Sequence, residues 1–271
     1  MNDDADTARR FLELHASERP LLLPNPWDLG SARLLAWLGF KALATTSGGF
    51  AASLGRLDGK VSREEAVAHA GAVTEATGLP VNGDFENCFA DDPAGVAETV
   101  KLALEAGVAG CSVEDWSGSE IYDIDLAAER VAAAADAAHG GAVQMVITAR
   151  AENHFRKHKD LDDTIERLLA YQEAGADVHY APGLRSVEQI GSVLEAVERP
   201  LNVLVVPGVP SVTELARAGV SRVSVGAAFA FAAYDALVEA AKELQGTGTH
   251  GYLERARRGY YEAAREAFAR V

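Results

Sequence analysis

The stretch "LPVNGDFE", residues 79–86, and the stretch "DPAGVAETVKLALEAG", residues 92–107, together decide the fold that we predict for this chain. The first is a short apolar run, which is typical of a buried strand. The second repeats its apolar residues at helical spacing and ends in Gly107, where a left-handed residue would close a helix. The pair therefore predicts one strand followed by one helix that leads back to the start of the next strand.

Apolar runs of the same kind recur along the chain, with helical segments between them. The others are "LLLPNP" (21–26), "KALATTS" (41–47), "VAGCSVED" (108–115), "VQMVITAR" (143–150), "ADVHYAP" (176–182), "LNVLVVPG" (201–208) and "VSRVSVG" (220–226). Many helices end in glycine just before the next strand, at Gly39, Gly78, Gly107, Gly175 and Gly219. Because the runs are continuous rather than alternating, the strands should be parallel and buried on both faces. We predict an α/β fold, a closed (β/α)8 TIM barrel, since "PNPWDLGSA" lacks the GxGxxG turn that would favour an open doubly wound sheet.

One further helix is predicted beyond the eighth unit. Residues 1–271 are expected to form a single barrel domain, with 248–271 as a C-terminal helical extension. Leu253, Ala256 and Tyr260 fall on one apolar stripe of that helix, together with Ala264. A complete barrel leaves such a stripe without a core, so we expect it to pack on a neighbouring subunit.

Composition narrows the partners and the compartment. The chain has 40 acidic and 25 basic residues, a net charge of −15, which argues against nucleic-acid binding. The sequence contains no apolar stretch of about 20 residues, and the start "MNDDADTARR" is acidic, so we expect no membrane segment and a cytoplasmic protein. Two cysteines without CxxC spacing fit a reducing compartment. Cys111 is expected in the core, and Cys88 is either a buried thiol or a catalytic one, of which we favour the first.

Polar residues gather where the predicted strands end, the edge at which barrel enzymes build their active sites. Asp84 and Glu86 follow the third strand, Glu114 ends the fourth and Arg150 ends the fifth. Carboxylates that converge on one mouth repel one another unless a cation lies among them, and oxygen ligands favour Mg²⁺ or Mn²⁺, held mainly through waters. Arg150 could bind a substrate carboxylate bidentately. The simpler alternatives are solvated acids or helix caps, and an Arg150 that pairs with Glu152.

Five fragments resemble motifs of the isocitrate lyase/phosphoenolpyruvate mutase superfamily, in the same order along the chain. They are "TTSGG" (45–49), "GRLD" (55–58), "GDFE" (83–86), "SVED" (112–115) and "TARAE" (148–152). The resemblance implies substrate binding by Thr45, Ser47, Gly48, Gly49 and Arg150, catalytic roles for Arg150 and Asp58, and a metal at Asp84, Glu86 and Glu114. From the residues alone, Ser47 to Gly49 could be a plain turn or a backbone nest for a carboxylate, and Asp58 could be only a turn residue.

The resemblance also implies a reaction class. Its members are Mg²⁺-dependent enzymes that form or cleave C–C or P–C bonds next to a 2-oxo acid through an enolate, and their tetramers exchange the last helix between barrels. We therefore expect a lyase for a small 2-oxo or 2-hydroxy (di)carboxylic acid, in a homotetramer or homodimer. The alternatives are an oxaloacetate-type decarboxylase, a phosphonopyruvate-type P–C enzyme, and a metal-dependent 2-oxo acid binding protein with little or no turnover.

The loop after Glu114 departs from this family. Lyases carry a Cys, Lys and His segment there and mutases a Lys and Asn, whereas residues 116–126 read "WSGSEIYDIDL". We expect poor cleavage of isocitrate, because Glu120 or Tyr122 could replace the lyase acid only if burial shifted its pKa toward neutrality.

Three histidines lie near the ends of the fifth and sixth predicted strands. His179 is expected to pack beneath the mouth, beside Tyr180. His154 and His158 are expected in a solvated loop, from which one could reach over the mouth.

Overall fold

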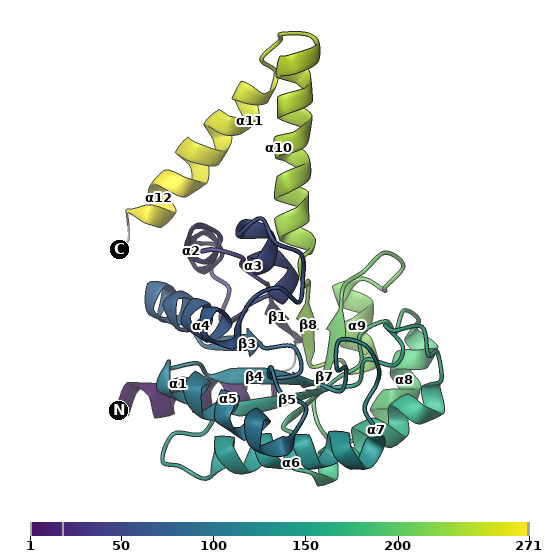
Figure 1. Cartoon of the computed structure of the whole chain (residues 1–271). Coiled ribbons are helices and arrows are strands. Elements are labelled where there is room, and N and C mark those ends of the chain that lie inside the picture. The colour runs from purple at the N-terminus through teal and green to yellow at the C-terminus, as the bar shows by residue number, and fades with distance from the viewer. Residues whose placement is uncertain (1, 18, 270–271) are drawn as a thin grey trace.

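The computed structural model describes residues 2–17 and 19–269, in which eight strands form a nearly closed barrel (Figure 1). The order around the barrel is β1-β8-β7-β6-β5-β4-β3-β2, and every paired neighbour is parallel. The strands are β1 (Leu21–Leu23), β2 (Leu43–Ala44), β3 (Val81–Asp84), β4 (Gly110–Glu114), β5 (Val146–Arg150), β6 (Val178–Tyr180), β7 (Leu201–Leu204) and β8 (Arg222–Ser224). The predicted TIM barrel is confirmed, with each strand inside its predicted apolar run.

Helices alternate with the strands. They are α1 (Asn2–Leu14), α2 (Leu29–Trp37), α3 (Ser47–Ser53), α4 (Arg63–Thr77), α5 (Pro93–Glu105), α6 (Ile124–His139), α7 (Leu161–Glu173), α8 (Val187–Ala196), α9 (Val212–Ala218), α10 (Ala228–Gly246), α11 (Tyr252–Gly259) and α12 (Arg265–Phe268), with a π-helical turn at Tyr260–Ala264. The glycines predicted to end helices all have positive φ, as expected for left-handed closure. Among the described residues, none of the helices is both long and apolar enough to cross a membrane.

One side chain ties together the strands at the seam of the barrel. β1 and β2 meet through a single backbone hydrogen bond, from Ala44 N–H to Pro24 O at 3.1 Å. Asn25, which follows β1, donates from Nδ2 to Thr45 O at 2.8 Å. Its Oδ1 accepts from the backbone N–H groups of Val225 and Gly226 at 3.0 and 2.9 Å. Asn25 thereby fixes the ends of the first, second and eighth strands relative to one another.

The interior of the barrel is polar, whereas TIM barrels are usually filled by bulky branched side chains. Thr148 on β5 donates to Asn82 Oδ1 on β3 at 3.3 Å, which spans the intervening strand across the inside. Asn202 on β7 donates to Ser224 Oγ on β8 at 3.0 Å. The buried apolar side chains are divided among four separate clusters. The two larger clusters join strands to covering helices, and a smaller one around Phe11 fills the amino-terminal end of the barrel, so the polar groups lie above it toward the mouth.

The amino-terminal end of the barrel is closed by α1. Phe11 is fully buried and belongs to a cluster with residues of β1, β5 and β6. A Cβ on Gly110 would lie 2.7 Å from a ring carbon of Phe11, so this glycine permits the ring to enter the barrel. The His15 ring stacks edge-on against Phe11, with ring centroids 4.9 Å apart. α1 therefore forms the floor of the barrel.

An ion pair between His139 and Asp177 predicts that the stability of the fold depends on pH. The imidazole of His139, in the last turn of α6, lies 3.0 Å from Asp177 Oδ2. The hydrogen bond to Asp177 raises the pKa of His139 above its usual value of 6.5. Folding then stabilises the charged imidazole, so the contribution is fully present below the unfolded pKa and is lost as pH rises through the folded pKa.

We expect the free energy of unfolding of wild type to exceed that of His139→Gln most at about pH 5.5, and the difference to shrink toward about pH 8.5. Urea titrations across this range measure the difference, with His158→Gln, at an exposed loop histidine, as the control. A gap between wild type and His139→Gln that is constant with pH would contradict the assignment.

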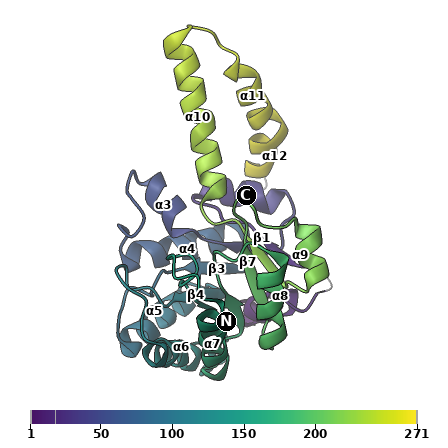
Figure 2. The ribbon, with the colours of Figure 1, turned by 90° about the vertical axis from the view of Figure 1, so that its right-hand side faces the viewer.

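The carboxy-terminal segment forms an arm, defined here as residues 228–269. Figures 1 and 2 show α10 projecting away from the barrel and α11 and α12 returning beside it. The predicted extra helix is present, since α11, the π-helical turn and α12 form one continuous helical run. Ala267 is buried and α12 contacts α2, whereas Leu253 and Tyr260 are 56% and 57% exposed. The predicted stripe is thus left largely uncovered by its own chain, and exchange between subunits stays a prediction.

Candidate active site

A cavity of about 440 Å³ opens at the carboxyl ends of the strands, where barrel enzymes place their active sites. It gathers most of the side chains that the sequence singled out. These are Thr45, Ser47, Gly48, Asp58, Asp84, Glu86, Glu114 and Arg150. Gly49 does not line it. A Cβ at Gly49 would lie 2.6 Å from Thr46 Cγ2 and 3.1 Å from Trp27 Cβ, so this glycine allows close packing behind the cavity wall.

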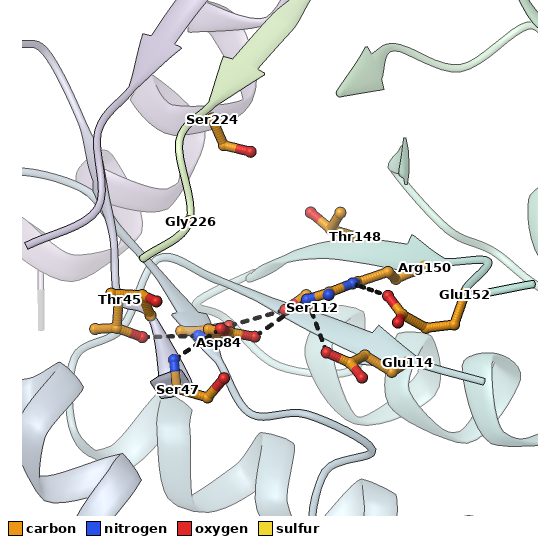
Figure 3. A network of polar contacts seen from close by, with 12 residues as sticks. Thr45, Ser47, Asp84, Ser112, Glu114, Thr148, Arg150, Glu152, Ser224 and Gly226 are labelled. Carbon is orange, nitrogen blue, oxygen red and sulfur yellow. Dashed lines mark hydrogen bonds and ion pairs between the residues drawn. The ribbon is translucent and has the colours of Figure 1, made fainter. Parts of the chain in front are cut away.

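Arg150 is the centre of a network of carboxylates, shown in Figure 3. Its Nη1 lies 2.7 Å from Glu114 Oε1 and 3.4 Å from Asp84 Oδ1, and its Nε lies 2.5 Å from Glu152 Oε1. The guanidinium also stacks over the Tyr180 ring, 4.8 Å from its centroid. The alternative in which Arg150 pairs with acids is therefore present in the structure, and a substrate carboxylate would have to share the guanidinium with them.

Asp84 is held from the second strand. Its backbone N–H donates to Thr45 Oγ1 at 2.8 Å, and its Oδ2 accepts from the backbone N–H of Ser47 at 2.9 Å. With Oδ1 facing Arg150, the carboxylate is oriented on both sides. Thr45 and Ser47 thus position Asp84, a role that the sequence did not reveal.

The expected glycine loop after β2 is a helix. α3 begins at Ser47, with Thr46 as its N-cap accepting from Gly49 N–H at 3.3 Å. Neither Gly48 nor Gly49 has positive φ, so the plain turn with left-handed glycines is wrong, whereas carboxylate binding by the backbone of this segment stays a prediction. A Cβ on Gly48 would lie 3.4 Å from Asp58 Oδ2, so Gly48 instead lets the Asp58 loop approach the helix start. Gly48 and Asp58 consequently meet at the rim.

Glu86 lies in an unusual turn after β3. Its φ is 53°, in the left-handed region that non-glycine residues seldom occupy. Burial raises the pKa of Glu86 to about 7, with further contributions from Asp84 and Asp58. Burial likewise raises the pKa of Glu114. Removing these carboxylates from water is unfavourable, and an added cation would reverse the effect.

The donor set fits a hard divalent ion in a limited way. Four acids, Asp58, Asp84, Glu86 and Glu114, line the cavity together with Arg150, Arg156 and Arg222, so carboxylate oxygens are available to a hard ion. Within residues 2–17 and 19–269, however, His, Cys, Asp and Glu side chains form no group of three or more that could hold a metal ion. The arrangement suits an ion that keeps several waters and touches one or two carboxylates, which is usual for Mg²⁺.

Arg156 was missed by the sequence analysis. Its Nε lies 3.0 Å from Glu152 Oε2, its Nη2 lies 3.9 Å from Glu114 Oε2, and it stacks over Trp116 at 4.5 Å. The four-residue spacing from Glu152 was the available signal, because it places both side chains on one face of a helical turn. Arg156 connects the loop after β4 to the carboxylate network.

The cysteines and two of the histidines are where they were expected. Cys88 and Cys111 are fully buried in one apolar cluster. His179 is fully buried, and burial lowers its pKa to about 4. His158 is exposed, but the expectation for His154 was wrong, because it is 5% exposed with Nδ1 3.0 Å from Thr164 Oγ1 on α7.

Neither of the two candidate acids in the loop after β4, Glu120 and Tyr122, lines the cavity. Glu120 is exposed and does not line the cavity. Tyr122 is buried, and its hydroxyl donates to Asp91 and accepts from Asn87 Nδ2. The bridge between Trp116 and Ile121 makes the intervening residues a compact turn. Neither candidate is therefore placed to protonate a bound enolate.

Sequence comparison gives two kinds of match. The profile of the phosphoenolpyruvate phosphomutase family matches residues 11–245. The 2,3-dimethylmalate lyase of Eubacterium barkeri is 32% identical over 203 residues, 71% of this chain and 68% of that protein. The oxaloacetate decarboxylase of Pseudomonas paraeruginosa (strain DSM 24068 / PA7) is 30% identical over 251 residues, 87% of this chain and 84% of that protein.

Structural comparison agrees. A solved protein of Burkholderia cenocepacia J2315, assigned no more finely than lyase/mutase, superposes with a TM-score of 0.91 at 46% identity. The match covers 94% of this chain and 93% of that protein. The likeness therefore extends over the arm as well as the barrel, since the barrel strands end at Ser224.

Proposed function

Because the chain belongs to the phosphoenolpyruvate mutase family of the isocitrate lyase/phosphoenolpyruvate mutase superfamily and is a carbon–carbon lyase of that type, we propose that it cleaves a C–C bond in a small 2-oxo or 2-hydroxy (di)carboxylic acid with the help of Mg²⁺ or Mn²⁺. The observation that carries the proposal is the Arg150 network at the strand ends. It places the Arg150 guanidinium among acidic side chains in a cavity of small-molecule size.

Asp84, Glu86 and Glu114 are the residues that would hold the metal, mainly through waters. The ion would supply positive charge where negative charge develops on the substrate oxygens. Arg150 would bind the substrate carboxylate beside it, because its planar fork matches two carboxylate oxygens. The backbone of Ser47 and Gly48 and the side chain of Thr45 would complete that wall of the site.

Asp58 is the carboxylate best placed to act as a base. It lies at the rim beside Gly48, and its Oδ1 accepts a hydrogen bond from the neighbouring Gly59 N–H at 3.2 Å. In cleavage of a 2-hydroxy acid, Asp58 would accept the hydroxyl proton as the C–C bond breaks. The bonding electrons then pass into the enolate of the leaving carboxylic acid, which takes up a proton to finish the reaction.

A decarboxylase for an oxaloacetate-like acid is the second candidate. The placement of Glu120 and Tyr122 away from the cavity favours it, because an enolate formed by loss of CO₂ can take its proton from water. The similarity to the Pseudomonas enzyme supports the same option.

A mass-spectrometric screen tests the proposal. Wild type and Asp84→Asn would be incubated with Mg²⁺ and a panel of 2-oxo acids, 2-hydroxy diacids and phosphonopyruvate. We expect one acid to be cleaved or decarboxylated by wild type and not by the variant. Tight binding of an acid without turnover by wild type would instead identify a binding protein.

The arm leads us to propose a homo-oligomer, a tetramer or a dimer. Its exposed apolar side chains are Phe229, Phe231, Leu237, Val238, Leu244, Leu253, Tyr260, Tyr261 and Phe268. An apolar surface of this extent on a projecting helical hairpin is unfavourable in water and is typical of a subunit interface.

We expect light scattering to give the mass of a dimer or tetramer for wild type, and a shift toward the monomer for the double substitution Leu237→Glu and Leu253→Glu. Both leucines are more than half exposed, so the change should not disturb the barrel. Leu38→Glu, at a leucine 62% exposed outside the arm, is the matched control. A monomeric wild type would reject the proposal.

A further inference from the structure

The cavity continues below the acidic mouth into the barrel. Arg150, Tyr180, Asn202 and Arg222 are successive register partners on β5, β6, β7 and β8, and all four line the cavity. Arg150 is the last residue of its strand, whereas Arg222 is the first of its own. With strands about 4.8 Å apart and tilted about 36°, three steps along such a row descend roughly 8 Å.

The walls of this deeper part, which we call the shaft, combine short polar side chains with Leu23, Leu204 and Tyr180. Ser112, Ser224 and Asn82 line it, and Figure 3 shows Ser112 and Ser224 on the strands around the Arg150 network. These positions face the inside of a barrel, where bulky aliphatic side chains normally meet and fill the centre. Their replacement by short side chains is what leaves the shaft open.

The floor of the shaft is a cation without a carboxylate. Arg222 is 2% exposed, its Nε donates to Asn202 Oδ1 at 3.0 Å, and its Nη1 lies 3.3 Å from His15 Nε2. In the described part of the chain, no acidic side chain pairs with it. Burial, and then Arg222 itself, lowers the pKa of His15 to about 3, so the imidazole is neutral.

Arg222 differs in this respect from the other buried arginines. Arg150 has three carboxylates, and Arg167 lies 3.2 Å from Asp115 and 3.0 Å from Asp163. Arg130 donates to three backbone carbonyls, those of Glu114, Asn87 and Ala90. Burial lowers the pKa of Arg222 to about 9, which leaves it protonated at neutral pH. A buried cation that lacks a counter-charge is unfavourable unless an anion joins it.

We infer that Arg222 is the floor of a second carboxylate subsite, with Asn202 and Ser224 beside it, and that it makes the enzyme selective for diacids. This inference rests on the proposed function, in which the 2-oxo end of the substrate binds near Arg150 at the mouth. A chain of a few carbons can run down the shaft between the two guanidiniums. The second carboxylate then reaches Arg222. This arginine lies away from the bond that breaks, and its role is to select diacids over monoacids.

Calorimetric titration with matched pairs of acids tests the inference. The probes are 2-oxoglutarate against 2-oxopentanoate, and 2-oxoadipate against 2-oxohexanoate, so each diacid is compared with a monoacid of equal carbon number. Wild type is expected to prefer one diacid. In Arg222→Met the affinity for that diacid should fall by about 10- to 100-fold, and the monoacid affinity should change by less than about twofold.

Thermal unfolding separates specificity from a structural role. Since Arg222→Met removes an uncompensated buried charge, its melting temperature should equal or exceed that of wild type. Arg33→Met, at a partly buried arginine of α2 that does not line the cavity, is the control and should leave both affinities unchanged. If Arg222→Met does not fold, Arg222→Lys should still weaken binding of the diacid more than binding of the monoacid, because a lysine cannot make the two-pronged contact with a carboxylate.

Two outcomes would overturn the inference while the proposed function stands. One is equal loss of monoacid and diacid binding with a lowered melting temperature, which would make Arg222 structural. The other is diacid binding that Arg222→Met leaves unchanged. If wild type binds none of the four acids, with or without Mg²⁺, the subsite is rejected, and the proposed function is decided separately by the screen with Asp84→Asn.

Discussion

Asp84→Asn is expected to lower kcat/KM for the cognate acid on the order of 10³-fold, about 4 kcal/mol of transition-state stabilisation, and to weaken Mg²⁺ binding measured by calorimetry. The loss should be this large because Asp84 joins three parts of the site. It faces Arg150 and accepts from Ser47 N–H, and it is the central acid of the proposed metal site.

The matched control is Glu120→Gln, which removes one carboxylate from the exposed loop after β4. It should retain nearly full activity and unchanged Mg²⁺ affinity. If Asp84→Asn bound Mg²⁺ as well as wild type and turned over the same acid at the same rate, the metal site would be wrongly assigned.

Arg150→Lys is expected to weaken binding of the 2-oxo acid by about 1–3 kcal/mol, although the charge is kept. Wild-type Arg150 contacts Glu114 and Glu152 and also lines the cavity. A lysine ammonium can neutralise the acids but cannot also match two carboxylate oxygens of a ligand. Titration of both proteins with the same acid gives the difference directly.

Two comparisons make this result interpretable. Arg150→Met would leave Glu114 and Glu152 without their main counter-charge, a loss of about 3–5 kcal/mol of stability, so it would confuse folding with binding. Arg156→Lys changes the other arginine of the mouth, whose guanidinium is stacked on Trp116. It should weaken binding of the 2-oxo acid less than Arg150→Lys does. Equal effects of the two lysine variants would remove the special role of Arg150.

The barrel and most of the site were predictable from the sequence because both depend on position along the strands. Polar residues at the ends of successive buried runs must meet at one mouth in a parallel barrel, which brought Asp84, Glu114 and Arg150 together. The ionic partners of Arg150 could not be ranked in advance, because the choice between Glu152 and the other acids depends on side-chain geometry that spacing does not contain.

The shaft was missed for a different reason. Asn202 and Arg222 stand inside runs that were identified as strands by their apolar neighbours, and a single polar residue in such a run did not change the assignment. Their signal was the alternation of period two, since Arg222 lies two residues before Ser224 and faces the same side. α3 was missed because helix starts at Ser-Gly-Gly are rare, given the low helix propensity of glycine.

The polar centre of the barrel also bears on how the molecule comes apart. The two largest apolar clusters do not join across the polar part of the interior: one runs from Ala66 to Ile147 and the other from Tyr122 to Val223. At the amino-terminal end, the smaller cluster around Phe11 connects strands from both sides of the barrel. Toward the mouth, the two halves are instead connected by the strand ladder at β4, β5 and β6 and by the Arg150 network that spans it, so hydrogen bonds and charge oppose opening of one half there, and ligand binding at Arg150 adds to that coupling.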